Sequence, residues 1–287
     1  MNEDELFFGE IALKRAAFAA RRTETLVAEE RSLAAQVEVL EMFLDYLPQR
    51  YPSLYRVTGS GDGRTVSLSA TGETLRLCDF VACPLELCAR LVQEDLVLMR
   101  ADDASPSHLH APRDPPPYVL SAAAVVFSFA DVGCRAGHPL PLIHAPVPGY
   151  EDQLSPLLNR TFAGLQVSKP LWRNNWALAD TAALDMPSSG NEATRAALRR
   201  ELPPQTRVLK AEFQTLRRLP TSNMILFTIR TYKQPMEELR AVPGAAAALA
   251  ASLRGLSPQL RSYKGLVTEQ AQEAMLTYLD EMAAGAH

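Results

Sequence analysis

The sequence predicts an α+β fold in which a largely antiparallel β-sheet is flanked by helices. Segments with the β-branched and aromatic content of strands occur at 172–179, 206–218 and 223–232, the last reading NMILFTIRTY. They cluster without the regular alternation of strand and helix that builds parallel sheets. Hydrophobic residues make up 47% of the 287 residues and charged residues 22%, so the chain has enough apolar side chains to bury a core.

The first predicted element is an amphipathic helix over 31–47, whose apolar side chains recur at steps of three or four residues. They are Leu33, Val37, Leu40, Phe43, Leu44 and Leu47. Pro48 and Pro52 are expected to end this helix.

A hairpin follows beside the glycine-rich cluster 59–63, where apolar and polar residues alternate. Its apolar residues are Val66, Leu68, Leu75 and Leu77. The glycine cluster lacks the G-x-G-x-x-G spacing of a nucleotide-binding loop, so nucleotide binding there is not expected.

The same patterns predict the remaining elements. Strands are expected at 95–100 and 118–129, with an irregular proline-rich loop at 105–117 between them. Helices are expected at 85–92, 151–165, 194–201, 245–253 and 268–282.

Charge and hydropathy exclude several classes of protein. Lys and Arg number 29 against 33 Asp and Glu, and the net charge of −4 offers no basic surface for nucleic acid. The N-terminus is acidic where a secretory signal is basic, and the longest apolar runs are too short to cross a membrane. We therefore expect a cytoplasmic protein with no nucleic-acid or membrane partner and with four reduced cysteines.

The chain has five His and four Cys, so few histidines and cysteines are available as candidate metal ligands. His108 and His110 are two residues apart and face the same way in an extended loop, which makes a shared metal geometrically possible. Cys83 and Cys134 each offer a thiolate for iron, although buried cysteines usually act as small hydrophobic residues. His144 lies in the rigid proline-rich segment 137–150, as a fixed ligand or as a core histidine bonded to a carbonyl.

Six blocks in register resemble the family typified by the catalytic subunit of haem-dependent oxidative N-demethylase. They are LDYLPQRYP at 44–52, QEDLVLM at 93–99, IHAPVPGYEDQL at 143–154, RNNW at 173–176, EFQTLRRLPTSNMILFTIRTY at 212–232 and YKGL at 263–266. The resemblance spans roughly residues 24 to 275. It implies a single enlarged PAS-like domain at 24–287 that encloses haem b, preceded by an N-terminal segment at 1–23.

The resemblance also implies an activity and its partners. The typifying enzyme oxidises a small secondary amine with O2, using electrons from separate flavin and iron–sulfur subunits. This sequence agrees in one respect, because it carries no dinucleotide fingerprint and no iron–sulfur cysteine spacing of its own. By resemblance, we expect a monooxygenase that N-dealkylates a small amine; the alternatives are a haem-based gas or redox sensor and a haem-free relative that binds a small ligand.

The family pattern also implies roles for individual residues. The pattern I-H-x-P-V-P falls on 143–148 and makes His144 the axial iron ligand, with His138 as the alternative. The pattern R-x-N-W includes Arg173, which either polarises O2 or pairs with a haem propionate.

Further roles are implied on two predicted strands. Arg217 and Arg218 are candidates for propionate pairing, the alternative being a solvated charged face. Alternation places Glu212, Gln214 and Arg218 on one face of the strand and Arg217 on the other. Phe213 departs from the family pattern, in which a basic residue is common. Tyr232 is a candidate catalytic phenol, or a residue that packs at the edge of the core.

Overall fold

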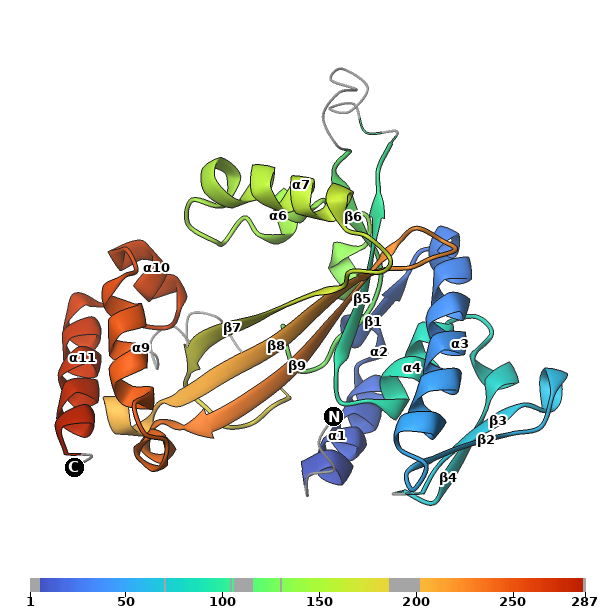
Figure 1. The fold of residues 1–287 in the computed structure, drawn as a ribbon, viewed down its shortest axis with the longest axis horizontal. Helices are drawn as coiled ribbons and strands as arrows, with labels where there is room; N and C mark the ends of the chain where they lie inside the picture. Colours follow the sequence, from blue (N-terminus) through green and yellow to red (C-terminus); the bar gives the residue numbers. More distant parts are fainter. Residues whose placement is uncertain are drawn as a thin grey trace.

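The computed structural model describes residues 6–69, 71–103, 105, 116–129, 131–185 and 202–285. These residues form an α+β fold built on a six-stranded sheet in the order β1-β6-β5-β9-β8-β7 (Figure 1). Every neighbouring pair in that sheet is antiparallel, which confirms the predicted sheet class. Its strands are β1 (Leu26–Ala28), β5 (Asp95–Ala101), β6 (Tyr118–Ala124), β7 (Leu171–Ala179), β8 (Val208–Arg218) and β9 (Ile225–Pro235).

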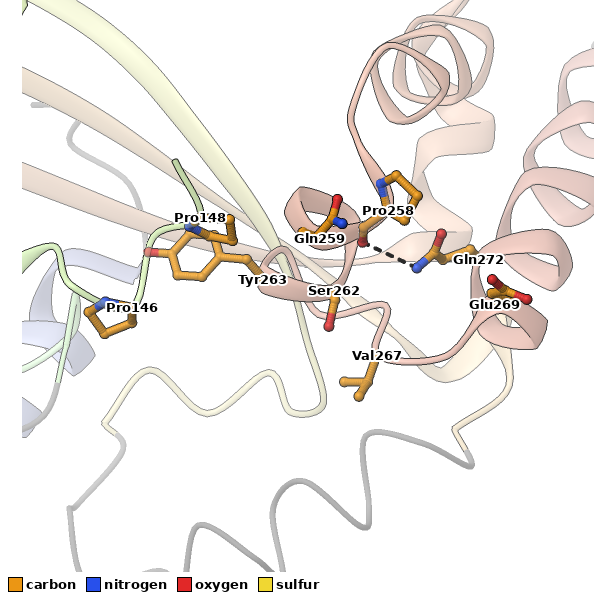
Figure 2. Close-up of a pocket in the computed structure, with 9 residues that line it drawn as sticks. All are labelled: Pro146, Pro148, Pro258, Gln259, Ser262, Tyr263, Val267, Glu269 and Gln272. Carbon is orange, nitrogen blue, oxygen red and sulfur yellow. Dashed lines mark hydrogen bonds between the residues drawn. The ribbon is translucent and has the colours of Figure 1, made fainter. Parts of the chain in front are cut away.

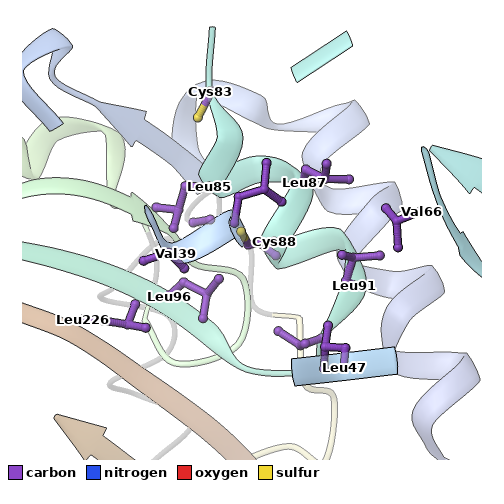
Figure 3. Close-up of a cluster of buried hydrophobic side chains, with 14 of the residues drawn as sticks. Val39, Leu47, Val66, Cys83, Leu85, Leu87, Cys88, Leu91, Leu96 and Leu226 are labelled. Atoms are coloured by element: carbon purple, nitrogen blue, oxygen red, sulfur yellow. The ribbon is translucent and has the colours of Figure 1, made fainter. Parts of the chain in front are cut away.

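Helices cover the large sheet in three groups, each with its own hydrophobic cluster. The first cluster lies between one face of β5, β6 and β9 and the helices α1 (Leu6–Ala20), α3 (Leu33–Arg50) and α4 (Pro84–Leu91). Figure 3 shows α4 placing Leu85, Cys88 and Leu91 in this cluster.

The second cluster covers the opposite face of the same strands. It is built with α6 (Leu140–Ile143) and α7 (Ser155–Gly164), which lie above the sheet in Figure 1. The third cluster packs α9 (Ala245–Arg254) and α11 (Glu269–Ala284) against the far end of β7 and β8, next to α10 (Pro258–Tyr263).

A second, smaller sheet extends the predicted hairpin. The hairpin consists of β3 (Thr65–Leu68) and β4 (Glu73–Arg76), and β2 (Tyr55–Thr58) adds a third strand in the order β2-β3-β4. The glycine-rich cluster 59–63 therefore links β2 to β3.

Several predicted boundaries are corrected. The helix expected to stop before Pro48 continues to Arg50, with Pro48 inside its last turn. The strand expected over 118–129 ends at Ala124, where the backbone amides of Val126, Phe127 and Ser128 turn onto the carboxylate of Asp95.

Other elements were only partly foreseen. The helix expected over 151–165 is a π-helical turn at Tyr150–Leu154 followed by α7. No pattern predicted α1, α10, β1 or the short helix α2 (Arg22–Thr25). The predicted helix 194–201 and the loop histidines His108 and His110 lie outside the described residues.

Helix α1 shares the core of the large sheet. Phe7, Ile11 and Phe18 belong to the same cluster as α3 and α4. The domain boundary between residues 23 and 24 stays a prediction. The packing of α1 bears on it, because α1 lies before this boundary and shares the core that lies after it. Among the described helices, none combines the length and the apolar composition needed to cross a membrane.

Candidate functional site

The segment that carries His144 is attached to the first half of β6. The amide of Leu120 donates to the carbonyl of His138 at 3.0 Å, and the amide of Gly137 donates to the carbonyl of Leu120 at 2.8 Å. Pro139 is the N-cap of α6, and His144 directly follows this single helical turn. The rigid, non-helical platform predicted from the prolines is therefore only partly confirmed, because a short helix presents the histidine.

Within the part of the chain that the structure describes, one ring nitrogen of His144 has a hydrogen-bond partner and the other has none. Nδ1 lies 2.9 Å from the carbonyl oxygen of Leu140. A carbonyl accepts but cannot donate, so Nδ1 carries the proton and Nε2 holds the lone pair. This tautomer is the one in which a metal-binding histidine usually has its second nitrogen bonded to a carbonyl.

The surroundings of His144 favour its neutral form. Burial lowers the pKa of the imidazole, the Leu140 carbonyl partly opposes this, and the nearby charges of Arg173 and Arg135 lower the pKa further. A neutral imidazole is the form that binds metals.

Arg173 is held by a hydrogen-bonded network across β7 and β8. The strand register pairs Arg173 with Gln214 and Asn175 with Glu212. Arg173 Nε donates to Gln214 Oε1 at 2.7 Å, and Gln214 Nε2 donates to Glu212 Oε2 at 2.8 Å. The network therefore determines both the orientation of the Gln214 amide and the position of Arg173.

Glu212 is the anion at the centre of this network. Asn175 Nδ2 donates to it at 3.1 Å, and the ammonium of Lys210 lies 2.6 Å from its other oxygen. Burial raises the pKa of this carboxyl, but Lys210 and the hydrogen bonds outweigh burial, so the net shift is downward. Glu212 is therefore ionised at neutral pH and balances the positive charge around it.

The C-terminal block YKGL locks α10 onto β7. Lys264 Nζ donates to Asn175 Oδ1 at 2.7 Å and to the carbonyl of Trp176 at 2.5 Å. Gly265 adopts a φ of +107°, and a Cβ there would collide with the carbonyl of Leu178. Only glycine fits this close approach without strain.

An open cleft of about 510 Å³ lies between the histidine-bearing segment and the C-terminal helices (Figure 2). Pro146 and Pro148 contribute one side, and Tyr263 with other residues of α10 and α11 the other. A volume of a few hundred cubic ångströms is typical of a site for a small molecule or cofactor. The blocks at 143–154, 173–176, 212–232 and 263–266 thus meet around one region of the structure.

A comparison with protein families agrees with this convergence. The model of the family described as haem-dependent oxidative N-demethylase, alpha subunit-like, matches residues 1–274. The chain belongs to this family. The family name indicates a haem-dependent oxidoreductase of the oxidative demethylase type.

For a member of this N-demethylase alpha subunit-like family, the structure sorts the predicted residues into two groups. The charge of Arg173 lowers the pKa of His144, and Pro146 and Pro148, which follow His144 in the chain, line the cleft. Arg217 is exposed and alternates away from Gln214, so its side chain lies on the other face of β8. Tyr232 also lies on that other face, 45% exposed, with its ring against the guanidinium of Arg230.

Arg218 lies on the predicted face of β8 but is already engaged. Its guanidinium donates to the carbonyls of Leu165, at 2.6 Å, and of Phe162, and to the hydroxyl of Tyr118 at 3.1 Å. These bonds attach the end of α7 to the sheet. The geometry thus favours a structural role for Arg218, and its propionate role stays a prediction.

The cysteines do not join the site. Cys83 is buried in the first cluster, and burial raises the pKa of its thiol. Cys134 is exposed, with its thiol donating to the carbonyl of Asp131. Among the described residues, no group of three or more His, Cys, Asp or Glu is placed to hold a metal ion. Haem requires no such group, since the porphyrin supplies four ligands and the protein one or two.

Sequence reasoning did not identify Lys210, Lys264 and Tyr150 as parts of the site. Lys210 carries a signal in hindsight, because it lies two residues before Glu212 on the same face of the strand. Lys264 and Tyr150 lie inside the family blocks YKGL and IHAPVPGYEDQL, but local pattern says nothing about what they contact.

Proposed function

We propose that this protein is a haem b monooxygenase that uses O2 to N-dealkylate a small amine or a related nitrogen compound, with electrons from a separate flavin and iron–sulfur reductase. One oxygen atom enters a C–H bond beside nitrogen, and the other leaves as water with two electrons and two protons. The resulting carbinolamine collapses to an aldehyde and the dealkylated amine. A PAS-like fold and a cytoplasmic location belong to the same proposal.

The observation that carries the proposal is the state of His144. Its Nδ1 is bonded to Leu140, its Nε2 has no hydrogen-bond partner among the described residues, and the segment that follows it lines an open cleft in a chain of this family. When bound, haem b supplies the iron that activates O2. His144 would hold that iron through Nε2, and the residues present fit the group in this respect.

Arg173 contributes a fixed positive charge. Its Nε is bonded to Gln214, and its two terminal nitrogens have no hydrogen-bond partner among the described residues. A positioned cation stabilises negative charge that develops on oxygen, in the manner of an oxyanion hole. Gln214 and Glu212 hold Arg173 in place, so its charge need not reorganise during the reaction.

The experiment that tests the proposal measures haem content and amine oxidation separately. Protein produced with a haem precursor is expected to show a Soret band, and His144→Ala is expected to lose it together with bound iron. His138→Ala serves as the matched control in the same segment and is expected to keep the band. If His144→Ala retains the wild-type Soret position and iron content, the ligand assignment is wrong.

Amine-dependent O2 consumption with an added reductase then tests the activity. Consumption that depends on both the amine and the electron donor, with release of an aldehyde, is the expected result. A haem protein that binds O2 but oxidises none of a panel of small amines would instead favour the alternative function, a haem-based gas or redox sensor. A folded protein that takes up no haem would contradict the proposed function.

A further inference from the structure

The chain adopts two uncommon backbone conformations directly after the histidine block. Gly149 has a φ of +71°, in the left-handed region that favours glycine. The next five residues, Tyr150–Leu154, form a π-helical turn before α7 begins. Such turns are rare and occur frequently at functional sites. Together these two features determine where Tyr150 points.

Tyr150 packs face to face on His144. The two ring centroids are 4.7 Å apart, and the ring planes differ by only 4°. The Leu140 carbonyl holds the edge of the imidazole at Nδ1, while Tyr150 covers one of its faces. The histidine side chain is therefore restrained in both position and plane.

The hydroxyl of Tyr150 is buried without a partner. The side chain is 3% exposed and belongs to the second hydrophobic cluster, and its hydroxyl has no hydrogen bond among the described residues. Leaving a buried hydroxyl unpaired is energetically unfavourable. Within the described part of the chain, the phenol is therefore a buried donor without an acceptor, on a ring that is stacked on the imidazole of His144.

We propose that Tyr150 is a positioning residue that sets the plane of the His144 imidazole, and that its hydroxyl donates a hydrogen bond to an oxygen atom of the group bound there. This inference rests on the proposed function, in which His144 holds haem. The oxygen acceptor would be a haem propionate. The phenol acts on the reaction through His144 and the bound group.

Three variants separate these roles. Tyr150→Phe removes the hydroxyl and keeps the stacked ring, and Tyr150→Leu removes the ring. Tyr278→Phe is the matched control, because the Tyr278 hydroxyl is also buried without a partner among the described residues but lies in the third cluster. Circular dichroism and thermal unfolding establish that each variant folds.

The haem dissociation constant tests the hydrogen bond. Tyr150→Phe is expected to weaken haem binding by about three- to tenfold, the value of one hydrogen bond, while Tyr278→Phe remains within about twofold of wild type. Repeating the titration with the dimethyl ester of haem identifies the acceptor. If the effect of Tyr150→Phe disappears with the ester, the acceptor is a propionate, and if it persists unchanged, the propionate assignment is wrong.

The plane of the imidazole is tested by two spectroscopic measurements. In the haem-loaded ferric protein, Tyr150→Leu is expected to broaden or shift the g values in electron paramagnetic resonance, which depend on the plane of the axial ligand. In the haem-free protein, ¹⁵N chemical shifts of His144 are expected to show the Nδ1–H tautomer in wild type and a mixture in Tyr150→Leu. The second measurement needs no haem, so it decides the positioning role even if the proposed function fails.

Two outcomes would overturn the inference. Wild-type haem affinity in Tyr150→Phe would show that the Tyr150 hydroxyl donates no hydrogen bond to the bound group. Wild-type g values and an unchanged His144 tautomer in Tyr150→Leu would show that Tyr150 does not set the plane of the imidazole.

Discussion

At the scale of single residues, the site depends on a relay of side chains that have fixed orientations. Gln214 accepts from Arg173 through its oxygen and donates to Glu212 through its nitrogen. If the Gln214 amide were rotated by 180°, both hydrogen bonds would be lost. Glu212 therefore holds Arg173 in place indirectly, by fixing the orientation of Gln214. The lowered pKa of Glu212 keeps this relay charged throughout the neutral range.

Arg173→Gln tests what the positive charge of Arg173 does. If the guanidinium polarises O2, amine-dependent O2 consumption per bound haem is expected to fall by roughly 10²-fold, the usual cost of removing one oxyanion-hole donor. Haem affinity is expected to stay near that of wild type. Arg160→Gln, an exposed change on α7, is the control. Weaker haem binding with unchanged turnover per haem would instead show that Arg173 anchors a propionate.

At the scale of elements, α3 is bonded to the turn that joins the two longest strands. The carboxylate of Glu38 accepts from the amides of Thr221 at 2.7 Å and Ser222 at 2.8 Å. Burial raises the pKa of Glu38, but the hydrogen bonds from Ser222 and Thr221 outweigh it, so the net pKa lies below the ordinary value. The turn between β8 and β9 is thereby held against the helix that covers their neighbours.

The lowered pKa of Glu38 determines how the stability of the protein changes with pH. A carboxyl whose pKa is lowered by folding stabilises the protein above its unfolded pKa, and this contribution disappears as the pH falls through the folded pKa. Glu38→Gln is expected to lower the free energy of unfolding by about 1 kcal/mol at neutral pH, because solvent at this part-exposed position screens hydrogen bonds to the charged group.

Denaturant titrations at several pH values measure this difference. The gap between Glu38→Gln and wild type is expected to close below the ordinary glutamate pKa of about 4.3. Glu41→Gln is the control, since it loses only an exposed ion pair with Arg64 and should cost less than about 1 kcal/mol. A gap that is independent of pH would contradict the role of the Glu38 charge.

At the scale of the whole molecule, helix α1 connects the N-terminus to the core of the large sheet. It buries apolar side chains in the first cluster, and the carboxylate of Glu10 pairs with Arg230 of β9 at 2.6 Å. Lys14 is fully buried, with its ammonium donating to the carbonyls of Val92, at 3.0 Å, and Glu94. Burial lowers the pKa of Lys14, which the charge of Asp95 partly opposes.

Removing residues 1–23 therefore tests the predicted domain boundary. We expect residues 24–287 alone to lose the cooperative unfolding transition, because the deletion exposes the first cluster and leaves Arg230 without Glu10. Within the full chain, Phe7→Ala at a position 1% exposed is expected to cost about 3–5 kcal/mol. Phe8→Ala, at a position 45% exposed, is the control and is expected to cost less than about 1 kcal/mol. A truncated protein that unfolds like wild type would confirm the boundary.

The sequence alone determined the sheet class and most of the elements, because these depend on local periodicity. The apolar stripe over 31–47 predicts α3, and alternation along β8 correctly places Glu212, Gln214 and Arg218 on one face. The order of six blocks also led to the family. Each of these signals is contained within a short stretch of chain or in the order of such stretches.

Only the tertiary structure decided which side chains meet. Packing attaches Arg218 to the carbonyls at the end of α7, places Tyr232 on the face of the sheet opposite Arg173, and brings Lys264 to Asn175 across 89 positions in the sequence. Periodicity gives the direction of a side chain relative to its own backbone but not the atoms that lie in that direction. Those atoms come from distant segments, and their positions depend on how the three clusters pack together.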